Sequence, residues 1–185
     1  MIRPLLLAAG LSISLGACAS ETAMPTTASA PRDMTPPASM AGDMTPTDRA
    51  GYVQMAAASD LFEMQSSNLA RTRAQSPDVR QFAEMMIADH TQTTAQLTAA
   101  ANAAGTPPDP RLLPMQVDMM NQLQGASAAD FDRVYMTQQV QAHEMALALH
   151  SNYARSGDNA NLRSVAATAT PIIEHHLGRA RQLAG

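Results

Sequence analysis

Four stretches of the chain place small and apolar residues three and four positions apart, the spacing that predicts amphipathic α-helices. The most regular stretch carries Val79, Phe82, Met86, His90, Thr93, Leu97 and Ala100. The last stretch carries Leu162, Val165, Ala169, Ile172, His176 and Leu183. Few segments alternate with the period of two that is typical of strands. The pattern therefore predicts an all-α protein.

Turn and capping residues divide this pattern into four long helices. Ser76 and Pro77 suit the N-cap and the first position of a helix, and Gly105 suits a helix stop. Ser127 and the acidic residue three positions later resemble a capping box. Pro171, inside the fourth helix, is expected to kink it or to open one hydrogen bond. The expected helices cover residues 48–74, 77–104, 127–155 and 158–183.

The connections between these helices differ in length. Tight turns join the first helix to the second and the third to the fourth. Residues 106–125 contain several prolines and form a long connection, in which residues 115–123 could make a short helix. Two antiparallel hairpins with one long crossover are typical of a ferritin-like four-helix bundle. We therefore expect this fold over residues 48–185.

Residues 1–17 resemble a bacterial signal peptide. Arg3 supplies a positive start, and the apolar residues 5–15 are too few for a membrane-spanning helix, which needs about 20. The run Leu15-Gly16-Ala17-Cys18 is similar to the lipobox of bacterial lipoproteins, in which the cysteine is lipidated. A plain secretory signal is disfavoured because the chain's one cysteine falls at this position. The next two residues lack the aspartate of an inner-membrane retention signal, which favours an outer-membrane anchor facing the periplasm.

Residues 18–47 are rich in proline, threonine, alanine and serine. Such a segment buries little apolar surface, so we expect a disordered tether between the lipid and the bundle. Its methionines could bind Cu(I) through their thioethers, but their spacing is interpreted as compositional. The methionines of the helices are interpreted as core-filling residues.

Composition narrows the possible partners. The net charge is −4 and no basic block is present, which argues against nucleic acid. The single cysteine excludes an intrachain disulfide. The membrane, through the lipid on Cys18, is the expected partner, and the residues indicate no protein partner.

Four polar residues, one on each predicted helix, fall on stripes that should face the core. They are Glu63, His90, His143 and His176. A carboxylate or imidazole in a bundle core costs free energy unless it is hydrogen-bonded or binds a metal. Four such groups therefore predict that they meet, around one metal ion or in a buried hydrogen-bond network. Asp89, beside His90, would orient one of the histidines from behind.

Residue counts from the turns test whether the four groups lie at one level. Glu63 and His90 are nearly equally far from Ser76 and should face each other. His176 is about five residues farther from the turn at residue 157 than His143, or about 7 Å at the helical rise. Five nearby residues could therefore replace one of the four as a ligand: Glu84, Asp89, Glu144, Glu174 and His175.

Several runs resemble the ferritin-like family catalogued as domain of unknown function 4142. They include Ala58-Ser-Asp-Leu-Phe-Glu63, Ser76-Pro-Asp-Val-Arg80, Met86-Ile-Ala-Asp89-His90, Ala142-His143 and His176-Leu177. The resemblance covers about residues 50–185 and implies a four-helix bundle in an exported bacterial protein, without a secure activity. The positions that it would carry over are Glu63, Asp89, His90, His143 and His176.

The chain departs from the di-iron pattern of ferritins. That pattern pairs Glu-x-x-His on two helices with a lone glutamate on each of the others. Here Ile87 and Ile173 stand three residues before His90 and His176, so the bridging carboxylates are missing. Ferroxidase chemistry is therefore disfavoured, whereas one zinc, copper, iron or nickel ion suits three histidines and a carboxylate.

The sequence thus predicts a lipid-anchored, ferritin-like bundle of the cell envelope that binds one transition metal and is not an enzyme. The alternative is a metal-free structural or interaction module with a buried His/Glu network. A redox enzyme is a third hypothesis, but no nucleophile elbow or phosphate-binding glycine loop supports an enzyme.

Overall fold

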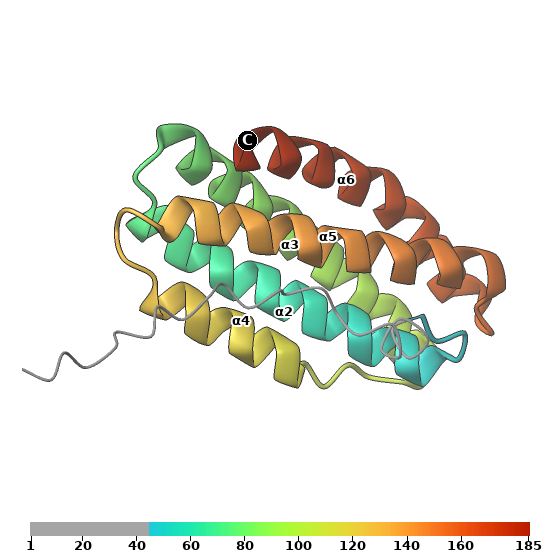
Figure 1. Cartoon of the computed structure of the whole chain (residues 1–185). Helices are drawn as coiled ribbons and strands as arrows, with labels where there is room; N and C mark the ends of the chain where they lie inside the picture. Colours follow the sequence, from blue (N-terminus) through green and yellow to red (C-terminus); the bar gives the residue numbers. More distant parts are fainter. Residues whose placement is uncertain (1–44) are drawn as a thin grey trace, which may run out of the picture. The chain divides into compact units, whose positions relative to one another are not determined.

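The computed structural model describes residues 45–185, which contain five helices and no strand (Figure 1). The helices are α2 (Arg49–Arg73), α3 (Pro77–Ala103), α4 (Pro114–Gly125), α5 (Phe131–Ser156) and α6 (Ala160–Ala184). The all-α prediction is confirmed. None of these described helices combines the length and apolarity needed to cross a membrane. The signal peptide, Cys18 and residues 19–44 of the tether lie outside the described residues, so those expectations stay predictions.

The four long helices form the bundle. The tight turns make α2 and α3 one hairpin and α5 and α6 the other, and the hairpins pack through α2 against α5 and α3 against α6. The long connection between the hairpins contains α4, which packs beside α2 and α5 (Figure 1). Two hairpins with one long crossover are thus observed as expected, and the short helix of the crossover is longer than residues 115–123.

The helix starts differ in part from the capping prediction. Ser76 is the N-cap residue of α3 and Pro77 its first residue, as predicted, but the Ser76 side chain makes no capping hydrogen bond. Instead Asp132 accepts a hydrogen bond from the Ser76 amide at 2.7 Å. Ser127 does not cap α5, because its hydroxyl donates to Asp130 and closes a separate turn before the helix. Asp130 and not Ser127 is therefore the N-cap residue of α5.

The start of α6 follows the same logic. Asn159, rather than Asp158, accepts the capping hydrogen bond, from the Leu162 amide at 3.1 Å. Asp158 is engaged elsewhere, since it accepts a hydrogen bond from the Tyr153 hydroxyl at 2.8 Å. Farther along α6, Pro171 stays inside a continuous helix at an exposed position.

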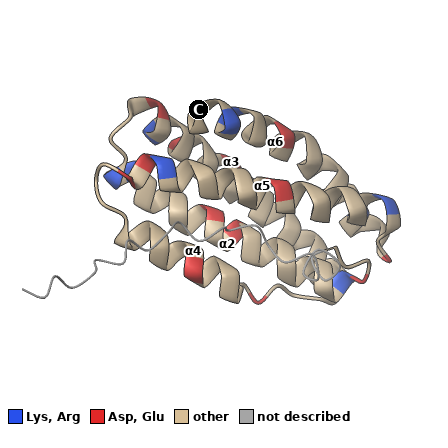
Figure 2. Ribbon diagram, viewed as in Figure 1, with Lys and Arg blue, Asp and Glu red and all other residues tan. Residues whose placement is uncertain are grey.

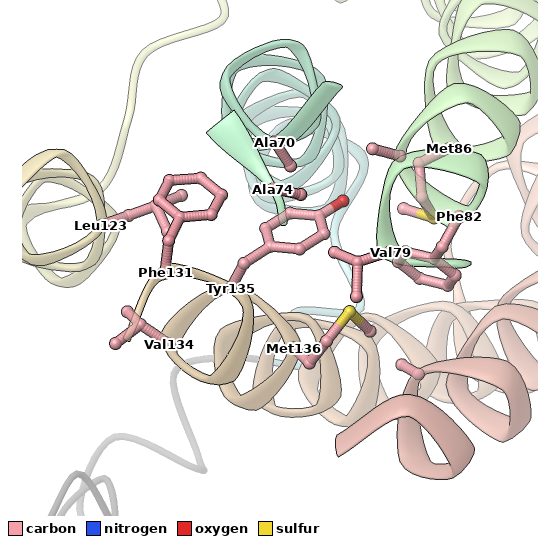
Figure 3. Packing of buried hydrophobic residues seen from close by; sticks show 12 residues of the cluster. Ala70, Ala74, Val79, Phe82, Met86, Leu123, Phe131, Val134, Tyr135 and Met136 are labelled. Carbon is pink, nitrogen blue, oxygen red and sulfur yellow. The ribbon is translucent and has the colours of Figure 1, made fainter. Parts of the chain in front are cut away.

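Apolar clusters fill both ends of the bundle. Near the α2–α3 turn, Phe82, Phe131 and Tyr135 pack among methionine, valine and alanine side chains (Figure 3). At the opposite end, Tyr52 and Tyr153 stack with ring centroids 3.9 Å apart. Each large side chain buried in this way contributes about 1.5–3 kcal/mol relative to an exposed one. The two clusters enclose the middle layer of the bundle, where the polar residues lie.

Arg73, at the end of α2, fixes the crossover to the bundle. Its guanidinium donates to the carbonyl oxygens of Gln124 at 2.8 Å and Ala126 at 2.6 Å. The same group lies 4.7 Å from the centroid of the Phe131 ring. The planar fork of arginine allows these contacts at once, so one side chain joins α2, the end of α4 and the start of α5.

Candidate metal centre

The four polar residues singled out from the sequence lie together in the middle of the bundle, where the three histidines form one close group and Glu63 belongs to a second with Asp60 and His90. Glu63 comes from α2, His90 from α3, His143 from α5 and His176 from α6. His90 is 6% exposed and the other three are each 1% exposed. Each long helix therefore delivers one polar side chain to a buried layer between the two apolar clusters.

The three imidazole rings form a close triangle. Their centroids are separated by 5.6 Å between His90 and His176, 5.5 Å between His143 and His176, and 6.3 Å between His90 and His143. One ring nitrogen of each histidine lies within 4.8 Å of the others. Glu63 adjoins two of the rings, because its Oε2 is 3.3 Å from His90 Nε2 and its Oε1 is 3.8 Å from His143 Nδ1.

Each histidine is held from behind by an oxygen acceptor. His90 Nδ1 donates to Asp60 Oδ1 at 2.8 Å, and the other oxygen of Asp60 accepts from Thr94 Oγ1 at 2.7 Å. His143 Nδ1 donates to the carbonyl oxygen of Gln139 at 2.7 Å. These bonds place a proton on the outer nitrogen of each ring, and the other nitrogen carries a lone pair whenever the ring is neutral.

The third histidine follows the same rule with the opposite nitrogen. His176 Nε2 donates to Asp89 Oδ2 at 2.9 Å. The remaining ring nitrogens, His90 Nε2, His143 Nε2 and His176 Nδ1, have no hydrogen-bond partner within residues 45–185. Metal-binding histidines usually donate their second ring nitrogen to a carboxylate or carbonyl, and here all three do.

The electrostatics of the layer favour a cation. Asp60, Glu63 and Asp89 approach it, and among the described residues no arginine forms an ion pair with any of them. In Figure 2 the basic residues lie mostly toward the ends of the long helices. Burial of a carboxylate such as Glu63 is costly without a compensating positive charge.

The pKa shifts follow from burial and from these contacts. Burial lowers the pKa of His143 to about 3 and also lowers the pKa of His176, so both rings are neutral at neutral pH. Burial raises the pKa of Glu63 to about 7. For His90, burial lowers the pKa, but Glu63 and Asp60 outweigh it and raise the pKa to about 9. A bound ion would replace the His90 proton, as ligation requires neutral imidazole.

The spacing between the ring nitrogens fits a small transition metal after modest adjustment. Metal–nitrogen distances of about 2.0 Å in a tetrahedral site place the ligand atoms about 3.3 Å apart. Nitrogens within 4.8 Å of one another reach that spacing through side-chain rotations of about an ångström. The donor set of three imidazoles and one carboxylate, without sulfur, suits ions that accept nitrogen and oxygen ligands.

The height mismatch predicted for His143 and His176 is absent at the level of the rings. Side chains on a helix tilt toward its N-terminus. In the α5–α6 hairpin this tilt carries His143 away from the turn at residue 157 and His176 toward it. The two rings therefore converge although their backbone positions are offset.

The substitute ligands kept open by the sequence do not enter the layer. Glu84, Glu144, Glu174 and His175 are exposed. Glu144 instead pairs with Arg181 at 2.8 Å. Asp89 reaches the site, but behind His176 and not as a fourth inner group.

Sequence reasoning missed Asp60 as the partner of His90. The available signal was its position three residues before Glu63 on the same stripe of α2. The sequence also gave no sign that Gln139 supports His143. The acceptor is the backbone carbonyl of Gln139, and whether the ring reaches it depends on the His143 rotamer and not on the residue type at position 139. Gln139 additionally donates through Nε2 to Ser66 Oγ at 3.0 Å, which fixes α5 against α2.

Comparisons with known proteins place the chain in a fold and a family. No curated protein matches it. CopM in the Cu(II)-bound form has a TM-score of 0.63 and 16% identity, covering 74% of this chain and 95% of that one. CopM in the Ag-bound form has a TM-score of 0.60 and 15% identity, covering 73% of this chain and 93% of that one. CopM in the Cu(I)-bound form has a TM-score of 0.61 and 14% identity, covering 73% of this chain and 94% of that one. Identities this low show a shared fold alone. The family described as Domain of unknown function (DUF4142) matches residues 33–183, and the chain belongs to that family.

Proposed function

We propose that this bundle binds one transition metal ion through His90, His143, His176 and Glu63. The observation that carries the proposal is that each of three neighbouring histidines has one ring nitrogen bonded to an oxygen and the other without a hydrogen bond, with one nitrogen of each ring within 4.8 Å of the others. Such an arrangement orients lone pairs toward an ion before it arrives. The protein acts as a metal-binding protein and not as an enzyme.

The alternative is a metal-free network of buried hydrogen bonds. A satisfied network would need donors for His143 Nε2, His176 Nδ1 and Glu63 Oε1, none of which has a hydrogen-bond partner in the described part of the chain. His90 differs, because its Nε2 lies 3.3 Å from Glu63 Oε2. Unpaired buried polar atoms cost about 1–3 kcal/mol each. The metal-bound form removes this cost in one step, so it is the better account of the geometry.

The ligand chemistry favours zinc, copper, iron or nickel, of which we propose the first three. Imidazole and carboxylate donors suit these dications, whereas Cu(I) prefers sulfur. The structures of similar fold carry Cu(II), Cu(I) or Ag, which makes copper the first ion to test. Irving–Williams preferences also favour Cu(II) at an unselective nitrogen site.

Metal content measures the proposal directly. The chain from residue 19 onward is dialysed against zinc, copper or iron, and the retained metal is counted by mass spectrometry. We expect one equivalent in the parent chain and in the His175→Ala control, which removes an exposed histidine beside the site. His143→Ala should retain less than a tenth as much. Equal retention by His143→Ala, or none by the parent, would contradict the proposal.

We also propose that the protein is held at the cell envelope by a lipid on Cys18, most consistently on the outer membrane facing the periplasm. The lipobox-like run ending at Cys18 and the lack of a following aspartate support this. Palmitate labelling and membrane fractionation of Cys18→Ala test it. The variant should lose the label and leave the membrane fraction; a labelled or membrane-bound variant would contradict the anchor.

A further inference from the structure

A small cavity opens into the bundle beside the proposed metal centre. Its lining includes three of the four central residues, Glu63, His90 and His176. Five further polar residues also line it: Ser59, Asp60, Thr93, Gln96 and His150. It has a volume of about 30 Å³. A water molecule needs roughly 10–15 Å³ on this measure, so the cavity holds about two waters or a ligand of two or three heavy atoms.

The cavity lies to one side of the centre. His143 is absent from its lining, whereas Glu63, His90 and His176 all contribute to it. An ion held by the four side chains would therefore be reached from the cavity past Glu63, His90 and His176. Closed structural metal sites have no such access, whereas sites with an exchangeable ligand keep one position open.

His150 gives the cavity a polar group that the metal set does not use. Its Nδ1 lies 3.2 Å from the Tyr52 hydroxyl, which orients the ring. The Tyr52 ring in turn stacks on Tyr153, so its position is fixed by the apolar cluster. Nε2 is thus the ring nitrogen of His150 left for a molecule inside the cavity.

Most of the apolar residues that line the cavity come from α6. Ala169 lies two helical turns before His176 on the same face and is 7% exposed. Ile172 and Ile173 continue this apolar part of the lining. A cavity of about 30 Å³ admits a compact ligand and has no room for a chelating one.

We propose that this cavity is a ligand position on the bound metal, holding a water molecule that a small monodentate anion can displace, with His150 as its hydrogen-bond partner. The inference rests on the proposed function and deepens it. A metal held by these residues would have a position accessible from the cavity, and the ligand class consists of anions of two or three heavy atoms.

Azide titration of the Cu(II)-loaded protein tests the inference. Copper stoichiometry is measured first, and azide binding is then followed through charge-transfer absorption and electron paramagnetic resonance. We expect one copper per chain and one saturable azide site. Ala169→Val, which fills the cavity, should weaken azide at least tenfold without changing the copper content. Ala167→Val is the matched control, because it makes the same substitution at an exposed position of α6.

A second variant keeps the test independent of packing. His150→Leu removes the hydrogen-bond partner and should weaken azide about fivefold, in line with the loss of one hydrogen bond. Parent-like azide binding in both Ala169→Val and His150→Leu would overturn the inference, as would a second copper ion per chain. Retained copper with no azide response would contradict this inference and leave the proposed function standing. No retained copper would contradict both.

Discussion

Asp89 Oδ2 accepts a hydrogen bond from His176 Nε2 at 2.9 Å, although the two residues lie on different helices, α3 and α6. The next residue, His90, points into the centre itself. Two consecutive residues of α3 therefore serve the site in different ways, one as an inner group and one as the support of another helix's histidine. The Asp89 side chain is 41% exposed, which makes it open to substitution without a packing defect.

Replacing this support should weaken metal binding without unfolding the bundle. Asp89→Asn keeps an acceptor oxygen but removes the charge that makes the His176 ring a better donor to a metal. Loss of such an outer partner typically costs 10–100-fold in affinity, and we expect about tenfold here by competition titration. Asp118→Asn makes the same change at an exposed position of α4 and should bind as the parent does. A metal affinity of Asp89→Asn equal to that of the parent would contradict the supporting role of Asp89.

His150 should leave a signature in the acid stability of the metal-free protein. Burial lowers the pKa of His150 to about 4, so between pH 6.5 and 4 the unfolded chain binds a proton that the folded chain does not. This contribution to stability is present above pH 6.5 and is lost as the pH falls. In His150→Asn, the free energy of unfolding should therefore decline less steeply with falling pH. The difference in slope should be about 1.4 kcal/mol per pH unit, which corresponds to one proton.

Urea unfolding from pH 4 to pH 8 measures that slope. The parent and His150→Asn curves should run parallel above pH 7, which serves as the internal control. Comparison of the two proteins separates His150 from Glu63, whose raised pKa acts with the opposite sign in the same range. Parallel curves across the acid range would contradict the assignment.

Arg73 should matter for stability and not for the metal. Arg73→Ala removes the hydrogen bonds to the Gln124 and Ala126 carbonyls and the contact with the Phe131 ring. We expect a loss of about 2 kcal/mol in the free energy of unfolding, measured by chemical denaturation. Arg71→Ala is the matched control, since Arg71 is exposed on the same turn of α2. An equal loss of unfolding free energy in both variants would contradict a specific stabilising role for the Arg73 contacts.

The helices and the four central residues were predictable from the sequence because both depend on periodicity. A stripe of residues spaced by three and four marks the buried face of α3, and His90 lies on it. The helix starts were less predictable, because the Ser76 amide finds a tertiary acceptor and the Ser127 hydroxyl bonds to Asp130 in a turn before α5. Asp132, which serves the Ser76 amide, lies 56 residues away.

The hydrogen-bond acceptors of the three histidines could not be predicted from the spacing of residues, for a related reason. Residue counting gives the height of the backbone, and it misses the tilt that brings His143 and His176 together. It also gives no rotamer, so it could not show that Asp60 rather than Asp89 holds His90, or that a backbone carbonyl holds His143. Position on a face is encoded locally, whereas the pairing of side chains depends on the packed bundle.

Thermal unfolding with and without metal tests the central claim most directly. A ligand present at 100 times its dissociation constant stabilises the folded state by about 2.7 kcal/mol, or roughly 8 °C for a chain of this size. We predict that copper, zinc or iron raises the melting temperature of the parent by this amount and leaves His143→Ala within about 1 °C of its metal-free value. No shift in the parent with any of the three ions, or an equal shift in His143→Ala, would contradict a metal centre built from these residues.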